Sequence, residues 1–156
     1  MSYEQWNPER AAEIVAEFAG LDGALLPILH ALQEAFGHVP AAAVPIVAGA
    51  LNLSRADVHG VVTFYHDYRS KPAGKHVLKL CRAEACQSRG ADAVVAKAEA
   101  TLGVPLGETT ADGVTTLEAI YCLGLCASGP SAMLDGRIVG RLGGARLDTL
   151  LTEARS

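Results

Sequence analysis

The four cysteines of this 156-residue chain fall into two closely spaced pairs. Four residues separate Cys81 from Cys86, three separate Cys122 from Cys126, and 35 lie between the pairs. Two irons bridged by two sulfides need four outer ligands, two for each iron, and thiolates are the usual ones. Two short-spaced pairs on converging loops can supply them. A 2Fe-2S cluster held by all four cysteines is therefore the leading hypothesis.

Other uses of four cysteines compete with this hypothesis. A structural zinc ion also takes four thiolates in short-spaced pairs, so the spacing leaves zinc open. Disulfides are disfavoured, because the chain does not begin with a signal peptide and because a chain that is 50% hydrophobic can bury a core without them. Four unrelated buried cysteines are also disfavoured, since no cysteine occurs outside the two pairs.

Each pair follows a short apolar run that is typical of a β-strand. HVLKL precedes Cys81 and LEAIY precedes Cys122, and both pairs lead into small or turn-forming residues. Functional residues of open α/β sheets gather at the C-terminal ends of the strands. We therefore expect one sheet edge to bring the four sulfurs together, without any cysteine inside a strand.

The second half of the chain, residues 75–156, predicts a small α/β domain with the order β-α-β-β-β-α. Strands are expected at 76–80 and 115–121, with a helix over 88–102 between them. Asp135 and Gly136 favour a two-residue turn between two short strands. Leucines at helical spacing close the chain as a last helix.

The first half, residues 1–70, predicts an N-terminal four-helix bundle. Asn7 and Pro8 mark one helix start, and Ser54 with Asp57 forms a capping box for another. Gly37 can end a helix in the left-handed conformation. A polar connector, RSKPAG at 69–74, separates this part from residues 75–156, so we expect two domains.

Composition excludes some function classes. With 13 basic and 17 acidic residues and no basic run, the chain is mildly acidic, and a nucleic-acid surface is not expected. No apolar stretch approaches the roughly 20 residues that span a bilayer. Thiolates free to bind a cluster suit a reducing compartment, so we expect a cytoplasmic protein.

No catalytic residues of its own are expected in this chain. There is no Gly-rich dinucleotide fingerprint after a strand, and no paired carboxylates or Ser-His or Cys-His set stands out by spacing. A 2Fe-2S centre moves single electrons and does not make bonds on an organic substrate. The chain is therefore expected to be an electron carrier.

The cysteine spacing, the CLGLC segment before a Gly-Pro, and the stretch ALLPILHALQEAFGHVP resemble the thioredoxin-like 2Fe-2S ferredoxin family, which includes the 24 kDa subunit of complex I. The resemblance covers about residues 21–155. It implies an α+β or α/β protein: an N-terminal four-helix bundle (1–70) followed by a thioredoxin-like 2Fe-2S ferredoxin domain (75–156), with Cys81, Cys86, Cys122 and Cys126 as cluster ligands.

Within the family, CRAEACQ and HGVVTFYH most resemble the gamma subunit of NAD-dependent formate dehydrogenases. Complex I subunits usually have Gly-Asn-Ala-Pro after the last cysteine, whereas this chain has Ala-Ser-Gly-Pro at 127–130. The resemblance implies docking on a flavin- and iron-sulfur-bearing, NAD-binding subunit, with FMN, NAD and a molybdenum cofactor only on partner subunits. A larger molybdenum-containing subunit would oxidise formate. Subunits of complex I or of a bidirectional hydrogenase are the alternatives, and a zinc-stabilised interaction protein is a further one.

The protein around such a cluster must control the cost of one added electron. Backbone N–H groups of the loops 82–85 and 127–129 can donate hydrogen bonds to sulfur, and Arg82 or Arg89 could add positive charge. Both arginines could equally be solvated surface residues. Gly124 and Gly129 are expected to serve tight backbone turns.

Overall fold

The computed structural model describes residues 3–156, and the chain separates into two compact units, one ending at Pro72 and one covering Ala73–Ser156. The boundary lies within the polar segment 69–74. Each unit has its own buried hydrophobic cluster. Each is therefore described by itself.

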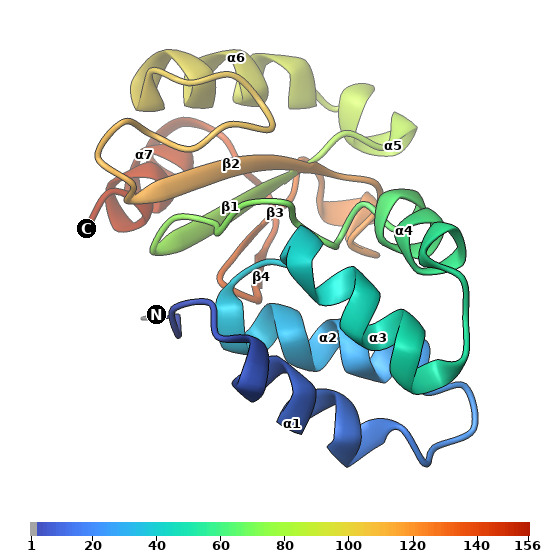
Figure 1. Ribbon diagram of the computed structural model, residues 1–156. Helices are drawn as coiled ribbons and strands as arrows, with labels where there is room; N and C mark the ends of the chain where they lie inside the picture. The colour runs from blue at the N-terminus through green and yellow to red at the C-terminus, as the bar shows by residue number, and fades with distance from the viewer. Residues whose placement is uncertain (1–2) are drawn as a thin grey trace. The chain divides into compact units, whose positions relative to one another are not determined.

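The first unit is helical (Figure 1). Its helices are α1 (Pro8–Phe18), α2 (Leu25–Phe36), α3 (Val44–Leu51) and α4 (Arg55–Phe64), and a 3-10 turn, η1 (Ala41–Ala43), precedes α3. The Asn7 side chain accepts hydrogen bonds from the first turn of α1, and Ser54 and Asp57 cap α4 reciprocally. Gly37 ends α2 with φ 75°. These caps satisfy backbone groups that have no partner inside a helix.

The core of the first unit joins all four helices with the segment that follows α4. α1 packs on α2 and α3, and α3 packs on α4. Large, fully buried side chains come from α2, α3 and α4, among them Ile28, Phe36, Val47 and Val58. Gln33 holds the later segment to α2: its amide donates to the Asp67 carbonyl at 2.8 Å and accepts from the Arg69 N–H at 2.7 Å.

The second unit is built on a four-stranded mixed sheet with the order β2-β1-β3-β4. The strands are β1 (His76–Cys81), β2 (Thr115–Ile120), β3 (Ala132–Leu134) and β4 (Arg137–Val139). β1 and β2 are parallel, and β3 is antiparallel to both β1 and β4. This is the α+β, thioredoxin-like arrangement that the resemblance implied.

Three helices accompany the sheet: α5 (Glu84–Gln87), α6 (Ala91–Leu102) and α7 (Gly144–Ala154). α6 and α7 pack against each other and against β1 (Figure 1). Leu78 and Leu80 of β1, Leu117 of β2, Ala98 of α6 and Leu151 of α7 are almost fully buried in one cluster. This core fixes the strand ends from which the cysteine loops leave.

Two local expectations for the second unit were wrong. Cys81 lies inside a strand, because the β1–β2 pairing continues to Cys81 opposite Ile120 and the Cys81 N–H donates to the Ser131 carbonyl at 2.9 Å. The helix expected from residue 88 begins at Ala91, because Gly90 adopts φ 92°. The turn before it is a separate short helix, α5, which contains Cys86.

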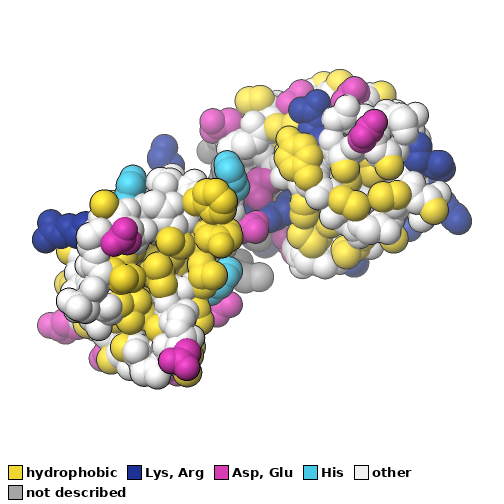
Figure 2. Space-filling view, turned by 90° about the vertical axis from the view of Figure 1, so that its right-hand side faces the viewer, with side chains coloured by type: hydrophobic (Ala, Val, Ile, Leu, Met, Phe, Trp, Pro, Cys, Tyr) yellow, Lys and Arg dark blue, Asp and Glu magenta, His cyan; other side chains and the backbone are white. Residues whose placement is uncertain are grey.

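None of the helices in residues 3–156 is long and apolar enough to cross a membrane. Hydrophobic side chains do gather on one face of the helical unit (Figure 2). The large hydrophobic side chains that are exposed in this unit as a whole are Trp6, Leu21, Leu26, Leu53, Phe64 and Tyr65.

Candidate metal centre

The first cysteine pair is carried by regular secondary structure. Cys81 is the last residue of β1, and Cys86 lies in the single turn of α5. The N–H of Cys86 donates to the Ala83 carbonyl at 2.9 Å, which turns the chain back towards the strand end. Each side chain has an exposed fraction of only 2%. Both sulfurs are therefore held inside the protein.

The second pair lies in irregular, exposed segments. Cys122 follows β2 with φ 76°, a conformation that non-glycine residues rarely adopt. Gly124, at φ 77°, turns the chain and donates its N–H to the Cys122 sulfur at 3.4 Å. Cys126 opens the 3-10 turn η2 (Cys126–Ser128). The Sγ atoms of Cys122 and Cys126 are 3.7 Å apart.

The fold brings the two pairs together. The N–H groups of Cys122 and Leu123 and the Cys86 side chain are among the groups that lower the pKa of the Cys81 sulfur. A Cβ atom placed on Gly129 would lie 3.2 Å from the Cys86 sulfur. The loop after Cys126 thus passes directly over the buried pair, and both pairs lie at the edge where β1 and β2 end.

The environment shifts two of the thiol pKa values in opposite directions. Burial raises the pKa of Cys81, but hydrogen bonds from the Ala83 N–H, the Cys86 side chain and the Cys122 and Leu123 N–H groups together lower it below its usual value. The pKa of Cys126 is raised, first by its hydrogen bond with Cys122 and then by the charge of Cys122. The surroundings of Cys81 thus favour its thiolate, the form that binds metals.

Arg89 joins the two cysteine segments. It follows α5, and its Nε donates to the Gly129 carbonyl at 3.1 Å. Arg82 has a different surrounding: one guanidinium nitrogen faces Asp92 at 3.5 Å, while its Nε is buried with no partner among the described residues. Arg89 therefore binds the loop of the second pair, a contact that its sequence position did not reveal. Arg82, the residue after Cys81, keeps a buried N–H donor without a partner among the described residues.

The residues present fit an iron-sulfur cluster. All four thiols are free, with no disulfide among them. Two thiolates on one tetrahedral metal at about 2.3 Å lie about 3.8 Å apart, close to the Cys122–Cys126 separation. Within residues 3–156 no three or more Cys, His, Asp or Glu side chains are grouped to hold one metal ion.

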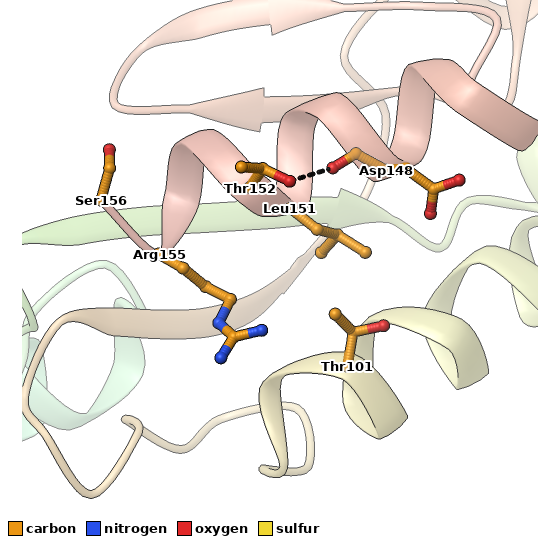
Figure 3. A pocket seen from close by; sticks show the side chains of 6 residues that line it. All are labelled: Thr101, Asp148, Leu151, Thr152, Arg155 and Ser156. Atoms are coloured by element: carbon orange, nitrogen blue, oxygen red, sulfur yellow. Dashed lines mark hydrogen bonds between the residues drawn. The ribbon is translucent and has the colours of Figure 1, made fainter.

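A pocket lies at the end of the sheet opposite to the cysteines. Thr101, Asp148, Arg155 and Ser156 help to line a pocket of about 470 Å³ at the C-terminal ends of α6 and α7 (Figure 3). The Thr115 hydroxyl, at the start of β2, binds the Ala154 carbonyl there at 2.5 Å. Lys97 pairs with Asp148 at 2.5 Å. Because this pocket holds both charge signs and no thiol, it is not a candidate for the redox site.

Comparison with known proteins shows the family to which this chain belongs. The sequence profile of the thioredoxin-like 2Fe-2S ferredoxin family matches residues 11–155. The chain belongs to this family. The family resemblance and the 2Fe-2S cofactor that it implied are therefore confirmed.

Named relatives are components of NAD(P)-linked complexes. The chain is 34% identical to an E-type subunit of the NADH-quinone oxidoreductase of Rhizobium meliloti, over 95% of this chain and 88% of the relative. It is 32% identical to the HndA subunit of the NADP-reducing hydrogenase of Solidesulfovibrio fructosivorans, over 85% and 77%. A solved NAD+-reducing NiFe-hydrogenase matches with a TM-score of 0.68 and 25% identity over 81% of this chain. The match spans only 22% of that hydrogenase chain.

The sequence missed three contacts of the site. The Arg89–Gly129 bond, the Cys86–Ser131 contact at 3.6 Å and the N–H groups of Cys122 and Leu123 at the Cys81 sulfur all join segments distant in sequence. Gly129 has φ −66°, so its role is close approach to Cys86 rather than the expected tight turn. Gly124, by contrast, does make such a turn.

Proposed function

We propose that this chain is the one-electron-transfer 2Fe-2S subunit of an NAD(P)-linked oxidoreductase complex, with Cys81, Cys86, Cys122 and Cys126 as the cluster ligands. The observation that carries the proposal is the convergence of two free thiol pairs at one sheet edge, one pair buried and one exposed. When bound, a 2Fe-2S cluster accepts and releases single electrons.

The residues of the chain itself prepare this role. The hydrogen bonds that lower the pKa of Cys81 stabilise negative charge on sulfur, and all but the one from the Cys86 side chain come from backbone N–H groups, which need no reorganisation. Cys81 and Cys86 keep water from one side of the site. Cys122 and Cys126 leave the other side open to a partner. Electrons would therefore enter and leave through the exposed pair.

The relatives support the complex I or hydrogenase form of this role better than the formate dehydrogenase form. CRAEACQ and HGVVTFYH favoured a formate dehydrogenase gamma subunit, but the relatives named above are subunits of an NADH-quinone oxidoreductase and of an NADP-reducing hydrogenase. We therefore place the chain beside a flavin- and iron-sulfur-bearing, NAD-binding subunit. A molybdenum-containing partner has no support from these relatives.

The helical unit is proposed to contribute to docking. Its exposed Phe64 and Tyr65 line a shallow depression together with Val61 and Asp57 of α4. The helical unit also has its own core and caps. Residues 73–156 should then keep a cluster but bind the flavin-bearing subunit poorly. If the truncated chain bound that subunit as tightly as the full chain, the helices would have no docking role.

Metal and sulfide analysis tests the proposal. The purified full chain should contain about two irons and two acid-labile sulfides, absorb visible light and bleach on reduction by one electron. One zinc without sulfide would instead establish the zinc-stabilised interaction protein. Co-purification should then identify a flavin-bearing subunit. A cluster-containing chain that never assembles with one would contradict the complex and leave a free ferredoxin.

A further inference from the structure

A small pocket lies beside the second cysteine pair, between the η2 loop and the start of α7. Its volume is about 190 Å³, and it is lined by Leu125, Ser128, Gly140, Arg141 and Arg146. Gly140 keeps it open, because a Cβ atom there would lie 3.0 Å from the Ser128 carbonyl oxygen and 3.2 Å from Leu125. Leu125 and Ser128 flank Cys126, so one wall of the pocket is formed by the loop that carries this cysteine.

The polar side chains that line the pocket can all donate hydrogen bonds, and none is acidic. Arg141 and Arg146 are exposed and have no ion-pair partner within residues 3–156. The Ser128 hydroxyl likewise has no hydrogen-bond partner in that part of the chain. In a chain with net charge −4, two arginines that line one small pocket are a local concentration of positive charge.

The backbone around the pocket adds to this positive charge. Arg146 lies in the first turn of α7, where Gly143 provides no side-chain cap and no acidic residue is present. A helix N-terminus carries partial positive charge, so a cation there is unfavourable unless an anion neutralises it. Arg141 adopts φ 54°, and its N–H binds the Ser128 carbonyl at 2.6 Å. The segment is thus held against the cysteine loop in a conformation that costs energy.

We propose that this pocket binds a single oxyanionic group, a carboxylate or a phosphate, through Arg141 and Arg146. A guanidinium group binds either with two parallel hydrogen bonds. The volume is below the roughly 300 Å³ at which pockets begin to hold drug-sized ligands, which fits one such group and not a nucleotide. The group can be a free ion or a carboxylate side chain of the flavin-bearing subunit. The second source rests on the proposed function, whereas the first does not.

The free-ion source is tested with inorganic phosphate and the cluster-loaded full chain at constant ionic strength. Phosphorus NMR relaxation should show saturable binding close to the reduced, paramagnetic cluster, with a Kd on the order of 1 mM. The double variant R141Q/R146Q should weaken binding on the order of tenfold. R55Q is the matched control, because Arg55 is also exposed, unpaired and at a helix start, but Ser54 caps that helix.

The partner source is tested by the affinity for the co-purified flavin-bearing subunit. If a partner carboxylate fills the pocket, R141Q/R146Q should weaken assembly on the order of tenfold and flatten its salt dependence. R155Q should do neither, because Arg155 is exposed and lies at the opposite end of the sheet. Loss of phosphate binding with unchanged assembly would assign a free anion. Loss of assembly without phosphate binding in the wild type would assign the partner carboxylate, and loss of both would show that the two compete.

The proposal is overturned if R141Q/R146Q behaves like the control variant in both experiments, R55Q for phosphate binding and R155Q for assembly. Iron and sulfide contents equal to the wild type are the control for folding. If the double variant binds less iron, the single variant R146Q replaces it, because Arg146 lies in regular helix and leaves the Arg141–Ser128 backbone bond intact. Failure of the cluster in the wild-type chain would instead refute the proposed function, so the two failures are distinguishable.

Discussion

The two cysteine pairs of this protein are positioned by different means. Cys81 and Cys86 belong to β1 and α5 and are almost fully buried, whereas Cys122 and Cys126 lie in loops and are exposed. Regular hydrogen bonding places the first pair, while positive φ angles at Cys122 and Gly124 shape the second. The difference indicates a division of labour: one pair anchors the site in the core, and the other presents it to the surface.

The largest expected effect comes from removing one thiol of each pair. Cys86→Ser and Cys126→Ser should both lose most of the bound iron and sulfide, because each iron needs two protein thiolates. Only Cys86→Ser should also destabilise the cluster-free chain, by about 1 to 3 kcal/mol, since it buries a hydroxyl in place of an apolar thiol. Iron analysis and urea unfolding of the cluster-free variants measure the two effects. Equal unfolding curves would remove the distinction between an anchoring and a presenting pair.

The next effect concerns the contact between the pairs. Gly129→Ala keeps an allowed backbone angle, but its Cβ would lie 3.2 Å from the Cys86 sulfur and 3.4 Å from the Arg89 Cδ. Overpacking of this kind costs about 1 to 3 kcal/mol. We expect a lower free energy of unfolding and faster cluster loss, followed by the decay of visible absorbance. Gly20→Ala is the control, because a Cβ atom there meets nothing within 4 Å. Wild-type cluster lifetime in Gly129→Ala would mean that the loop can move away from Cys86.

A smaller effect is expected from the bond that joins the two segments. Arg89→Gln removes the 3.1 Å hydrogen bond to the Gly129 carbonyl. A hydrogen bond from a charged group contributes about 1.5 to 3 kcal/mol, and exposure of Arg89 places this one at the lower end. Cluster release to a chelator should accelerate by roughly tenfold, while Arg55→Gln leaves it unchanged. Arg89→Lys should not restore the wild-type rate if the Nε geometry is what matters.

The smallest effect is a difference in thiol reactivity with pH. In the cluster-free chain the pKa of Cys126 is raised by its hydrogen bond with Cys122, so its thiolate, the reactive form, appears only above the usual pH of a thiol. Its alkylation rate should therefore keep rising with pH where an ordinary cysteine has levelled off. Cys81 has a lowered pKa, yet burial should keep it unreactive until the chain unfolds. Mass spectrometry of peptides alkylated at several pH values tests both. Rapid labelling of folded Cys81 would show that the buried site opens.

Local sequence patterns predicted most of the helices and strands. The capping residues Asn7 and Ser54, the Asp135–Gly136 turn and the two apolar runs before the cysteines all predicted elements that the structure contains. The expectation of cysteine-free strands failed because strand pairing, rather than local sequence, decides where β1 ends. The ladder reaches Cys81 since Ile120 and Ser131 are there to pair with it. The short helix α5 was missed because a single turn leaves no periodic pattern.

By itself the sequence predicted which atoms would bind metal, because two short-spaced cysteine pairs are the candidate donors whatever surrounds them. It also determined the helices and strands that lead to each pair, since caps and apolar periodicity act over a few residues. Only the tertiary structure decided which pair is buried, that the Cys122 and Leu123 N–H groups reach the Cys81 sulfur, and that Arg89 holds Gly129 over Cys86. These contacts join residues about 40 positions apart. They depend on β1 and β2 ending at the same sheet edge beside the η2 loop, which no local pattern encodes.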